Sequence, residues 1–343
     1  MLLLAGCLGV FSALVVGLAA TRLGDGLGLL DFPDDAGGRK LHARVTPLVG
    51  GIAVAVACVG ATAASLLAYA DAGPGVGQHL LWFGIATLAM FLNGLADDRF
   101  LLSPRLRLGI AMLVLLLVVI EAPDFSLSVV RFSGEDEFHI LGLGAEALTL
   151  LCLVGLLNAV NMADGKNGIV LSLGLTWSII LLFRLPAPMI PILVAVGAAL
   201  AVLLWFNMRS KLFLGDGGSY AISTIFGLLS IYSYNHDFAV VRADDVVLMF
   251  AVPVMDTIRL VVARSFQRRS PFSGGRDHLH HYLYASVGWP RGLWIYVTLV
   301  AVPNAGALIL PGTAPEWLAV TVVAYILVLR RAQRPSHLRL TTS

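Results

Sequence analysis

The stretch LTLLCLVGLLNAVNMADGKNG, residues 148–168, joins an apolar run to a dense polar end. Its first half is typical of a membrane helix, yet the run continues into Asn158, Asn161 and Asp164. Because residues three apart lie on one broad side of a helix, these polar side chains would project together. The glycines that follow let the backbone turn close to a ligand. Such groups at the edge of a membrane segment indicate a functional site, although a simple helix cap has a similar composition.

The composition is that of a membrane protein. Of the 343 residues, 58% are hydrophobic and only 13% are charged, whereas a soluble domain carries about a quarter charged residues. The net charge is +2, and we expect no nucleic-acid partner. The three cysteines, Cys7, Cys58 and Cys152, lie in apolar runs without a CxxC spacing. We therefore expect them to be small core residues, not disulfides or metal ligands.

Eleven apolar segments approach the length that crosses a bilayer, which is about 20 residues. No linker or shift in composition separates them, so residues 1–343 form one predicted domain. The sequence predicts an all-α polytopic membrane protein with about eleven transmembrane helices. The segments lie near residues 1–20, 47–70, 78–95, 105–121, 145–162, 169–184, 189–208, 219–235, 244–263, 291–310 and 317–332.

The distribution of basic residues predicts the orientation. With the N-terminus outside, the outer segments hold only Arg131, Arg184 and Arg242, and the other 20 of the 23 Lys and Arg residues fall on the inner side. Cytoplasmic loops carry the excess of basic residues in membrane proteins. We therefore predict an outer N-terminus and a cytoplasmic C-terminus. The outer loop 122–144 has two alternating stretches that predict a small hairpin.

Most unusual polar clusters then fall on the inner side. Asp97-Asp98 ends the third segment, and two adjacent carboxylates repel unless a cation or proton relieves them. The turn Leu214-Gly215-Asp216-Gly217-Gly218 leads into the eighth segment and suits a diphosphate with its metal. Mg²⁺ takes such oxygen ligands and usually keeps substrate phosphates in its shell. Each cluster alone is also compatible with a solvated helix end.

Two further inner loops are basic. Lys40 follows Arg39 and could pair with a phosphate, or could be a plain positive-inside anchor. The largest inner loop carries Arg276-Asp277-His278-Leu279-His280-His281. Three histidines suggest zinc, but the spacing favours phosphate hydrogen bonding or proton transfer. Jointly, the inner clusters predict a metal-assisted reaction centre for phosphorylated substrates at the cytoplasmic face.

In this order the motifs resemble those of the polyprenyl-phosphate N-acetylhexosamine-1-phosphate transferases. The resemblance spans roughly residues 30–285 and is closest to the bacterial branch that uses UDP-GlcNAc and undecaprenyl phosphate. The motifs that carry it are Arg39-Lys40-x-His42 with Pro47 and Gly50-Gly51, Asp97-Asp98, Asn158-x-x-Asn161-x-x-Asp164-Gly165, Phe213-Leu214-Gly215-Asp216, and Arg276-x-His278-x-His280-His281.

The resemblance implies a reaction and a set of residue roles. UDP-sugar and polyprenyl phosphate would give polyprenyl-diphospho-sugar and UMP, with Mg²⁺ or else Mn²⁺ as cofactor. Asp97 would take the proton of the lipid phosphate, and Phe213 would stack on uracil. The implied metal ligands are Asp216, Asp98 and Asp164. The implied catalytic residues are Asp97, Asp98, Asp164, His278, His280 and His281. The implied substrate-binding residues are Lys40, Asn158, Asn161, Asn207, Phe213 and Arg276.

Two positions depart from the family pattern. Lys166-Asn167 replaces a hydrophobic residue followed by Asp or Asn after Asp164-Gly165, which adds a cation if this turn faces the uracil. Gly274-Gly275 replaces the commoner Pro-Asp before Arg276. That loop is expected to touch the sugar, so this departure concerns the identity of the sugar and not the type of reaction.

Other functions remain open at this point. Within the enzyme class, the alternatives are a phospho-N-acetylmuramoyl-pentapeptide transferase and a transferase for another UDP-N-acetyl sugar. A transporter is the alternative from another class, but transporters place polar groups near the membrane midplane in broken helices. We expect a multi-pass protein of the bacterial plasma membrane that binds undecaprenyl or decaprenyl phosphate. Its pathway (teichoic acid, lipopolysaccharide or another cell-wall glycan) and a homodimer are left open.

Overall fold

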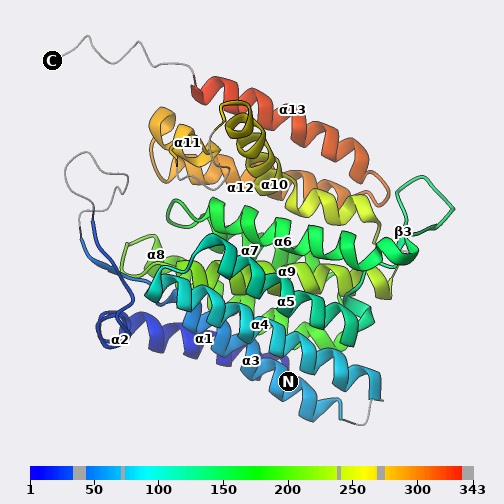
Figure 1. The fold of residues 1–343 in the computed structure, drawn as a ribbon, viewed down its shortest axis with the longest axis horizontal. Helices are drawn as coiled ribbons and strands as arrows, with labels where there is room; N and C mark the ends of the chain where they lie inside the picture. The colour runs from blue at the N-terminus through cyan, green and yellow to red at the C-terminus, as the bar shows by residue number, and fades with distance from the viewer. Residues whose placement is uncertain (34–43, 71–73, 238–240, 269–274, 334–343) are drawn as a thin grey trace.

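The computed structural model is a bundle of helices with two short hairpins (Figure 1). It describes residues 1–33, 44–70, 74–237, 241–268 and 275–333. In these ranges the α-helices are α1 (Leu2–Leu18), α2 (Ala20–Leu27), α3 (Gly50–Ala68), α4 (Pro74–Phe100), α5 (Pro104–Glu121), α6 (Ala145–Ala163), α7 (Ile169–Leu182), α8 (Ile190–Asn207), α9 (Gly215–His236), α10 (Ala243–Phe266), α11 (Leu279–Val287), α12 (Arg291–Ile309) and α13 (Ala314–Gln333).

Single-turn 3₁₀ helices connect some of these elements: η1 (Pro123–Phe125), η2 (Gly142–Gly144) and η3 (Ala187–Met189). The strands form two antiparallel pairs, β1 (Leu30–Asp31) with β2 (Thr46–Pro47) and β3 (Val129–Val130) with β4 (His139–Ile140). The second pair confirms the hairpin predicted in residues 122–144. Local sequence explains where helices begin. At α5, for example, the Ser103 hydroxyl accepts a hydrogen bond from the Leu106 amide, and Pro104 takes the first helical position.

Each of the eleven predicted segments coincides with one helix, although α7 has only 14 residues. Six of them, α3, α4, α6, α8, α10 and α12, are long and apolar enough to cross a membrane alone. A seventh span results if α1 and α2, which are bent by 70° at their junction, count as one. The predicted all-α polytopic class is confirmed, whereas the orientation in the membrane stays a prediction.

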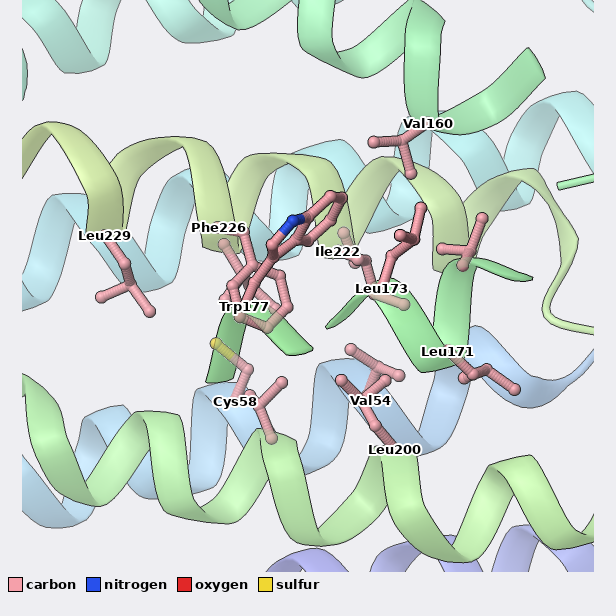
Figure 2. Close-up of a cluster of buried hydrophobic side chains, with 14 of the residues drawn as sticks. Val54, Cys58, Val160, Leu171, Leu173, Trp177, Leu200, Ile222, Phe226 and Leu229 are labelled. Atoms are coloured by element: carbon pink, nitrogen blue, oxygen red, sulfur yellow. The ribbon is translucent and has the colours of Figure 1, made fainter. Parts of the chain in front are cut away.

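Helix α9 lies in the centre of the bundle. Its residues from Gly217 to Tyr234 are all buried, although several are serine, threonine or tyrosine. Trp177 of α7 packs edge-on against Phe226 of α9, with ring centroids 5.4 Å apart. Figure 2 shows this cluster, in which side chains of α3, α6, α7 and α8 surround those of α9. Because neighbouring helices cover it, α9 does not need the apolar surface of a lipid-facing helix.

The two ends of the bundle differ. Helices α2 and α11 lie at one end, and the β3–β4 hairpin lies at the other (Figure 1). All three cysteines are free, but Cys7 and Cys152 are exposed on α1 and α6, so only Cys58 is the core residue that we predicted. The expectation for the other two was wrong because a helix in a membrane bundle also exposes apolar positions on its outer face.

Candidate active site

The carboxyl end of α4 meets the amino end of α9. The Asp98 carboxylate accepts hydrogen bonds from the backbone amides of Asp216 and Gly217, one on each oxygen, both at 3.0 Å. A carboxylate in this position satisfies free amides at a helix N-terminus and favours the positive end of the helix dipole. Asp98 therefore fixes the first turn of α9, which carries Asp216.

Glycines make this close approach possible. A Cβ atom on Gly94 of α4 would lie 2.3 Å from the Asp216 carbonyl oxygen, so no larger residue fits there without a shift of the backbone. Gly215 has a φ of +75°, a conformation that glycine adopts without steric cost. The close approach of the α4 and α9 main chains at Gly94 thus allows the Asp98 side chain to reach the turn that carries Asp216.

Arg107 of α5 links the carboxylates of these two helices. Its guanidinium pairs with Asp97, which is 5% exposed, and its Nη1 lies 3.6 Å from Asp216 Oδ2. Arg107 was not predicted as a site residue, because Arg105 and Arg107 together look like ordinary basic residues at the start of a helix. The signal that could have found it is an arginine one turn inside an apolar span, which needs a partner.

The polar end of α6 faces the same place. The Asn161 amide donates to Asp216 Oδ1 at 2.7 Å and to the Ser219 hydroxyl at 3.1 Å. Asp164 follows at the C-terminus of α6. Burial, and then the charges of Asp216 and Asp98, raise the pKa of the Asp164 carboxyl well above its usual range. The three predicted motifs therefore share one electrostatic environment.

Neighbouring elements hold the turn after Asp164. Asn207 at the end of α8 accepts a hydrogen bond from the Gly168 amide on its side-chain oxygen, at 2.7 Å. Its main-chain carbonyl accepts another from Asn167, at 2.8 Å, while Trp289 donates to the Asn167 carbonyl at 3.0 Å. We predicted Asn207 as a nucleotide contact. In the structure its side chain is buried, at 5% exposed, and the residue holds the turn through its hydrogen bonds to Asn167 and Gly168.

The histidines of α11 and its N-cap close the site from the other side. A Cβ atom on Gly165 would lie 2.3 Å from His280 Nε2, so this ring packs directly on the turn. His280 is 1% exposed, and neither ring nitrogen has a hydrogen-bond partner within the described residues. Burial, then the neighbouring His281 and His278 charges, holds the pKa of His280 well below its usual value. Burial and His278 lower the pKa of His281 to about 4.

Cations lie beside these histidines. The Lys166 ammonium is 3.6 Å from the centroid of the Tyr284 ring. Burial, and then the charge of Arg276, lower the pKa of this lysine. A lysine held on an aromatic face keeps its charge while losing part of its hydration. The turn thus presents a fixed cation next to two imidazoles, which suits an anionic group of a ligand.

The other predicted residues fall in several places. Asn158 lines a small pocket together with Pro104, Arg107, Leu108, Leu157 and Tyr220, away from the turn. Phe213 is held by its backbone: its amide donates to the Pro47 carbonyl at 2.8 Å, and its carbonyl accepts from the Gly50 amide at 3.0 Å. Lys40 lies outside the described residues, as does Gly274. Arg276 is exposed at the edge of the histidine cluster.

Mg²⁺ is the cofactor implied by the resemblance, and its fit can be tested on the carboxylates. Burial, and then the charges of Asp216 and Asp98, raise the pKa of the Asp164 carboxyl, and a divalent cation would relieve the part that is due to charge repulsion. Among the described residues, no three His, Cys, Asp or Glu side chains have the geometry to enclose a metal ion, so the predicted ligands Asp98, Asp164 and Asp216 do not form such a group. Asp98 instead accepts the backbone amides of Asp216 and Gly217. Mg²⁺ needs only one or two carboxylates when substrate phosphates complete its shell, so it fits.

Fold and site together define a polytopic helical protein with a carboxylate-rich, cation-flanked centre at one end of its bundle. Residues 80–234 match the sequence profile of glycosyl transferase family 4, which is consistent with the family that the motifs resemble. The predicted membrane transferase class is thereby confirmed.

Similar proteins extend the match over most of the chain. It is 26% identical to a probable undecaprenyl-phosphate N-acetylglucosaminyl 1-phosphate transferase of Bacillus subtilis, over 93% of this chain and 87% of that protein. It is 29% identical to the undecaprenyl-phosphate alpha-N-acetylglucosaminyl 1-phosphate transferase of Yersinia pestis, over 90% and 86%. It is 28% identical to the protein of that name from Escherichia coli K12, over 90% and 83%.

Proposed function

We propose that this protein transfers a sugar 1-phosphate, most directly GlcNAc-1-phosphate, from a UDP-sugar to a polyprenyl phosphate and releases UMP. The names of its relatives support a polyprenyl-phosphate acceptor and an N-acetylglucosaminyl 1-phosphate donor group. One structural observation carries the proposal. Asp98, Asp216 and Asn161 meet by direct hydrogen bonds, beside Asp164 and Arg107.

Asp216 and Asp164 are the proposed holders of Mg²⁺. The oxygens of Asp98 already accept two backbone amides, so this residue acts first by positioning Asp216. When bound, Mg²⁺ would neutralise charge on the donor diphosphate and on the departing UMP. Asn161 keeps the Asp216 carboxylate in one orientation through its 2.7 Å hydrogen bond.

Arg107 is the proposed anchor for the acceptor phosphate. It lines the small pocket with the apolar side chains Leu108 and Leu157 and with the amide Asn158. This mixture suits a phosphate whose prenyl chain continues along the bundle surface. A phosphate monoester is largely ionised at neutral pH, with a second pKa of about 6. The acceptor therefore needs a cation more than a strong base, and Asp97 would take up the remaining proton once the phosphate replaces it on Arg107.

The donor would occupy the space between the carboxylates and the histidines. Lys166, fixed on Tyr284, and the exposed Arg276 offer positive charge to the diphosphate. The neutral His280 and His281 offer hydrogen bonds without adding charge. The roles of Lys40 at a phosphate and of Phe213 on uracil remain predictions from the resemblance.

In the proposed reaction an oxygen of the lipid phosphate attacks the sugar-bearing β-phosphorus of the donor. The bond between that phosphorus and the bridging oxygen breaks, and the oxygen leaves with UMP. The rival path has an aspartate as the covalent nucleophile. Single-turnover reactions without lipid separate the two, because only the covalent path would leave a phosphosugar on the enzyme.

The activity is tested by UMP release from purified protein with undecaprenyl phosphate and a panel of UDP-sugars. We expect UDP-GlcNAc to be turned over fastest, other UDP-N-acetylhexosamines more slowly, and no UMP to form without the lipid. Release only from UDP-N-acetylmuramoyl-pentapeptide would identify the runner-up activity instead. We further propose that the site opens to the cytoplasm of a bacterial plasma membrane and begins a cell-envelope glycan.

A further inference from the structure

Helix α10 carries a buried carboxylate that the sequence analysis did not consider. Asp256 lies inside the apolar run of this helix and is 4% exposed. An ionisable residue inside a membrane helix is costly and marks a functional or tightly paired site. In this chain, Asp256 contacts the N-terminal end of α11, where the histidine motif begins.

The two carboxylate oxygens of Asp256 have different side-chain partners. Oδ2 faces His278 Nδ1 at 3.0 Å, and the Leu279 amide donates to both oxygens, at 3.2 Å to Oδ2 and 3.3 Å to Oδ1. Oδ1 accepts from the Tyr325 hydroxyl of α13 at 2.7 Å and from Arg259 Nη2 at 2.8 Å. The arginine and the tyrosine therefore fix Oδ1, whereas His278 is the only side chain that faces Oδ2 within the described residues.

The segment before His278 is held to the same helix. Arg259 donates to the main-chain carbonyl of Asp277, and Arg264 pairs with the Asp277 carboxylate at 3.2 Å. A Cβ atom on Gly275 would lie 2.1 Å from that carboxylate oxygen, so the glycine leaves room for it. Helix α10 thus binds both the backbone and the side chains that lead into His278.

We propose that Asp256 is a positioning residue for His278: it keeps the ring hydrogen on Nδ1 and directs Nε2 away from α10. The inference rests on the proposed function only for the catalytic use of this ring. A carboxylate oxygen can only accept, so the nitrogen that faces it must carry a hydrogen. The tautomer of an imidazole is set by the partner of its other nitrogen.

The remaining groups around His278 do not compete for this nitrogen. Its ring stacks on that of His280, with centroids 5.2 Å apart and 11° between the planes, and meets His281 edge-on at 6.3 Å. These contacts fix the ring plane but do not select a tautomer. Selection then comes from Asp256, and Nε2 remains available to accept a hydrogen bond or proton from a substrate.

The decisive variant is Asp256→Asn. Arg259 and Tyr325 would hold the amide oxygen on their side, since Arg259 can only donate and the Tyr325 hydroxyl already accepts from Arg259 Nε at 3.0 Å. The amide NH₂ would then face His278 Nδ1 and donate to it, which moves the ring hydrogen to Nε2. The Leu279 amide would keep the remaining oxygen as its acceptor, because it already lies 3.3 Å from Oδ1. Tyr325→Phe is the matched control, because it removes a partner of the same carboxylate and leaves the histidine contact intact.

The test combines nitrogen NMR of histidine-labelled full-length protein with UMP release. His278→Gln assigns the signal of this ring. We expect hydrogen on Nδ1 in the wild type and on Nε2 in Asp256→Asn, with kcat lowered roughly 10- to 100-fold and KM for the UDP-sugar within about threefold. Tyr325→Phe should keep the wild-type tautomer and kcat within about threefold.

A neutral ring with its hydrogen on Nε2 in the wild type would overturn the proposal, even if Asp256→Asn did not fold. Equal losses of kcat in Asp256→Asn and Tyr325→Phe, without a change of tautomer, would also overturn it and leave a structural role. If the wild type released no UMP, the proposed function would fail, while the tautomer measurement would still decide the role of Asp256.

Discussion

At the scale of single residues, Arg107 is the side chain whose replacement should most affect binding of the proposed lipid phosphate acceptor. It pairs with Asp97 and lies 3.6 Å from Asp216. Replacing Arg107 by Gln should raise KM for the lipid phosphate roughly 10- to 100-fold, since a hydrogen bond to a charged group contributes about 1.5–3 kcal/mol. Steady-state kinetics with varied undecaprenyl phosphate measure this. Arg105→Gln, an exposed position two residues away, is the control and should change KM little.

The charge at Asp164 predicts how Mg²⁺ should stabilise the protein. Burial and the neighbouring carboxylates raise the pKa of this carboxyl above its usual range, so without metal its contribution to stability is lost as pH rises. A bound cation requires the ionised form. The rise in unfolding temperature on adding Mg²⁺ should therefore be larger at mildly alkaline than at mildly acidic pH. Equal shifts at both pH values, or an unchanged response in Asp164→Asn, would contradict this.

Sequence reasoning reached part of the site at this scale. Asp98, Asn161, Asp164 and Asp216 were predicted because several motifs placed oxygen ligands at helix ends, and the structure brings them together. Arg107 and Asp256 were missed. Their importance depends on which helices pack side by side, and the sequence contains no direct record of such packing. The sequence predicted that Asn207 belongs to the site but not that it supports the turn. A buried asparagine that supports a turn and one that binds a base cannot be distinguished by sequence.

At the scale of the elements, the site depends on the contact between α4 and α9. The strongest test is Gly94→Ala, because the added Cβ would lie 2.3 Å from the Asp216 carbonyl, a backbone atom that cannot rotate away. Overpacking of this kind costs about 1–3 kcal/mol or more, and we expect a lower unfolding temperature together with loss of activity.

Gly109→Ala on the adjoining α5 is the matched control. Nothing lies within 4 Å of a Cβ atom at Gly109, and alanine is favoured over glycine inside a helix by about 1 kcal/mol. This variant should be as stable as the wild type or more stable, with normal activity. If both variants behaved alike, the close approach of α4 to α9 would not be the feature that positions Asp216.

The helices themselves were predictable because apolar runs of bilayer length leave few alternatives to helix. The predicted segment 219–235 became Gly215–His236, since the glycine-rich turn enters the helix itself and is capped by Asp98. The capping of one helix by a side chain of another is a tertiary contact, and local sequence does not predict it. The central position of α9 was also not predicted, because its serine and threonine content resembles that of an exposed helix.

At the scale of the whole molecule, the account requires that the site and the β3–β4 hairpin lie on opposite sides of a membrane. Single cysteines at Lys211 and Glu137, both exposed, report on the two ends. They would be introduced after replacing Cys7, Cys58 and Cys152 by alanine. In intact cells, a membrane-impermeant maleimide should label Glu137→Cys and not Lys211→Cys. Labelling of Lys211→Cys alone would reverse the orientation predicted from the basic residues.

The central claim concerns which bond is made, and phosphorus labelling tests it most directly. Purified protein would receive UDP-GlcNAc labelled at the β-phosphorus, with Mg²⁺ and undecaprenyl phosphate. The account predicts that the label enters the lipid fraction while UMP leaves unlabelled, and that Asp216→Asn lowers the rate roughly 100-fold or more. Label recovered in free UDP, with only the sugar on the lipid, would contradict it.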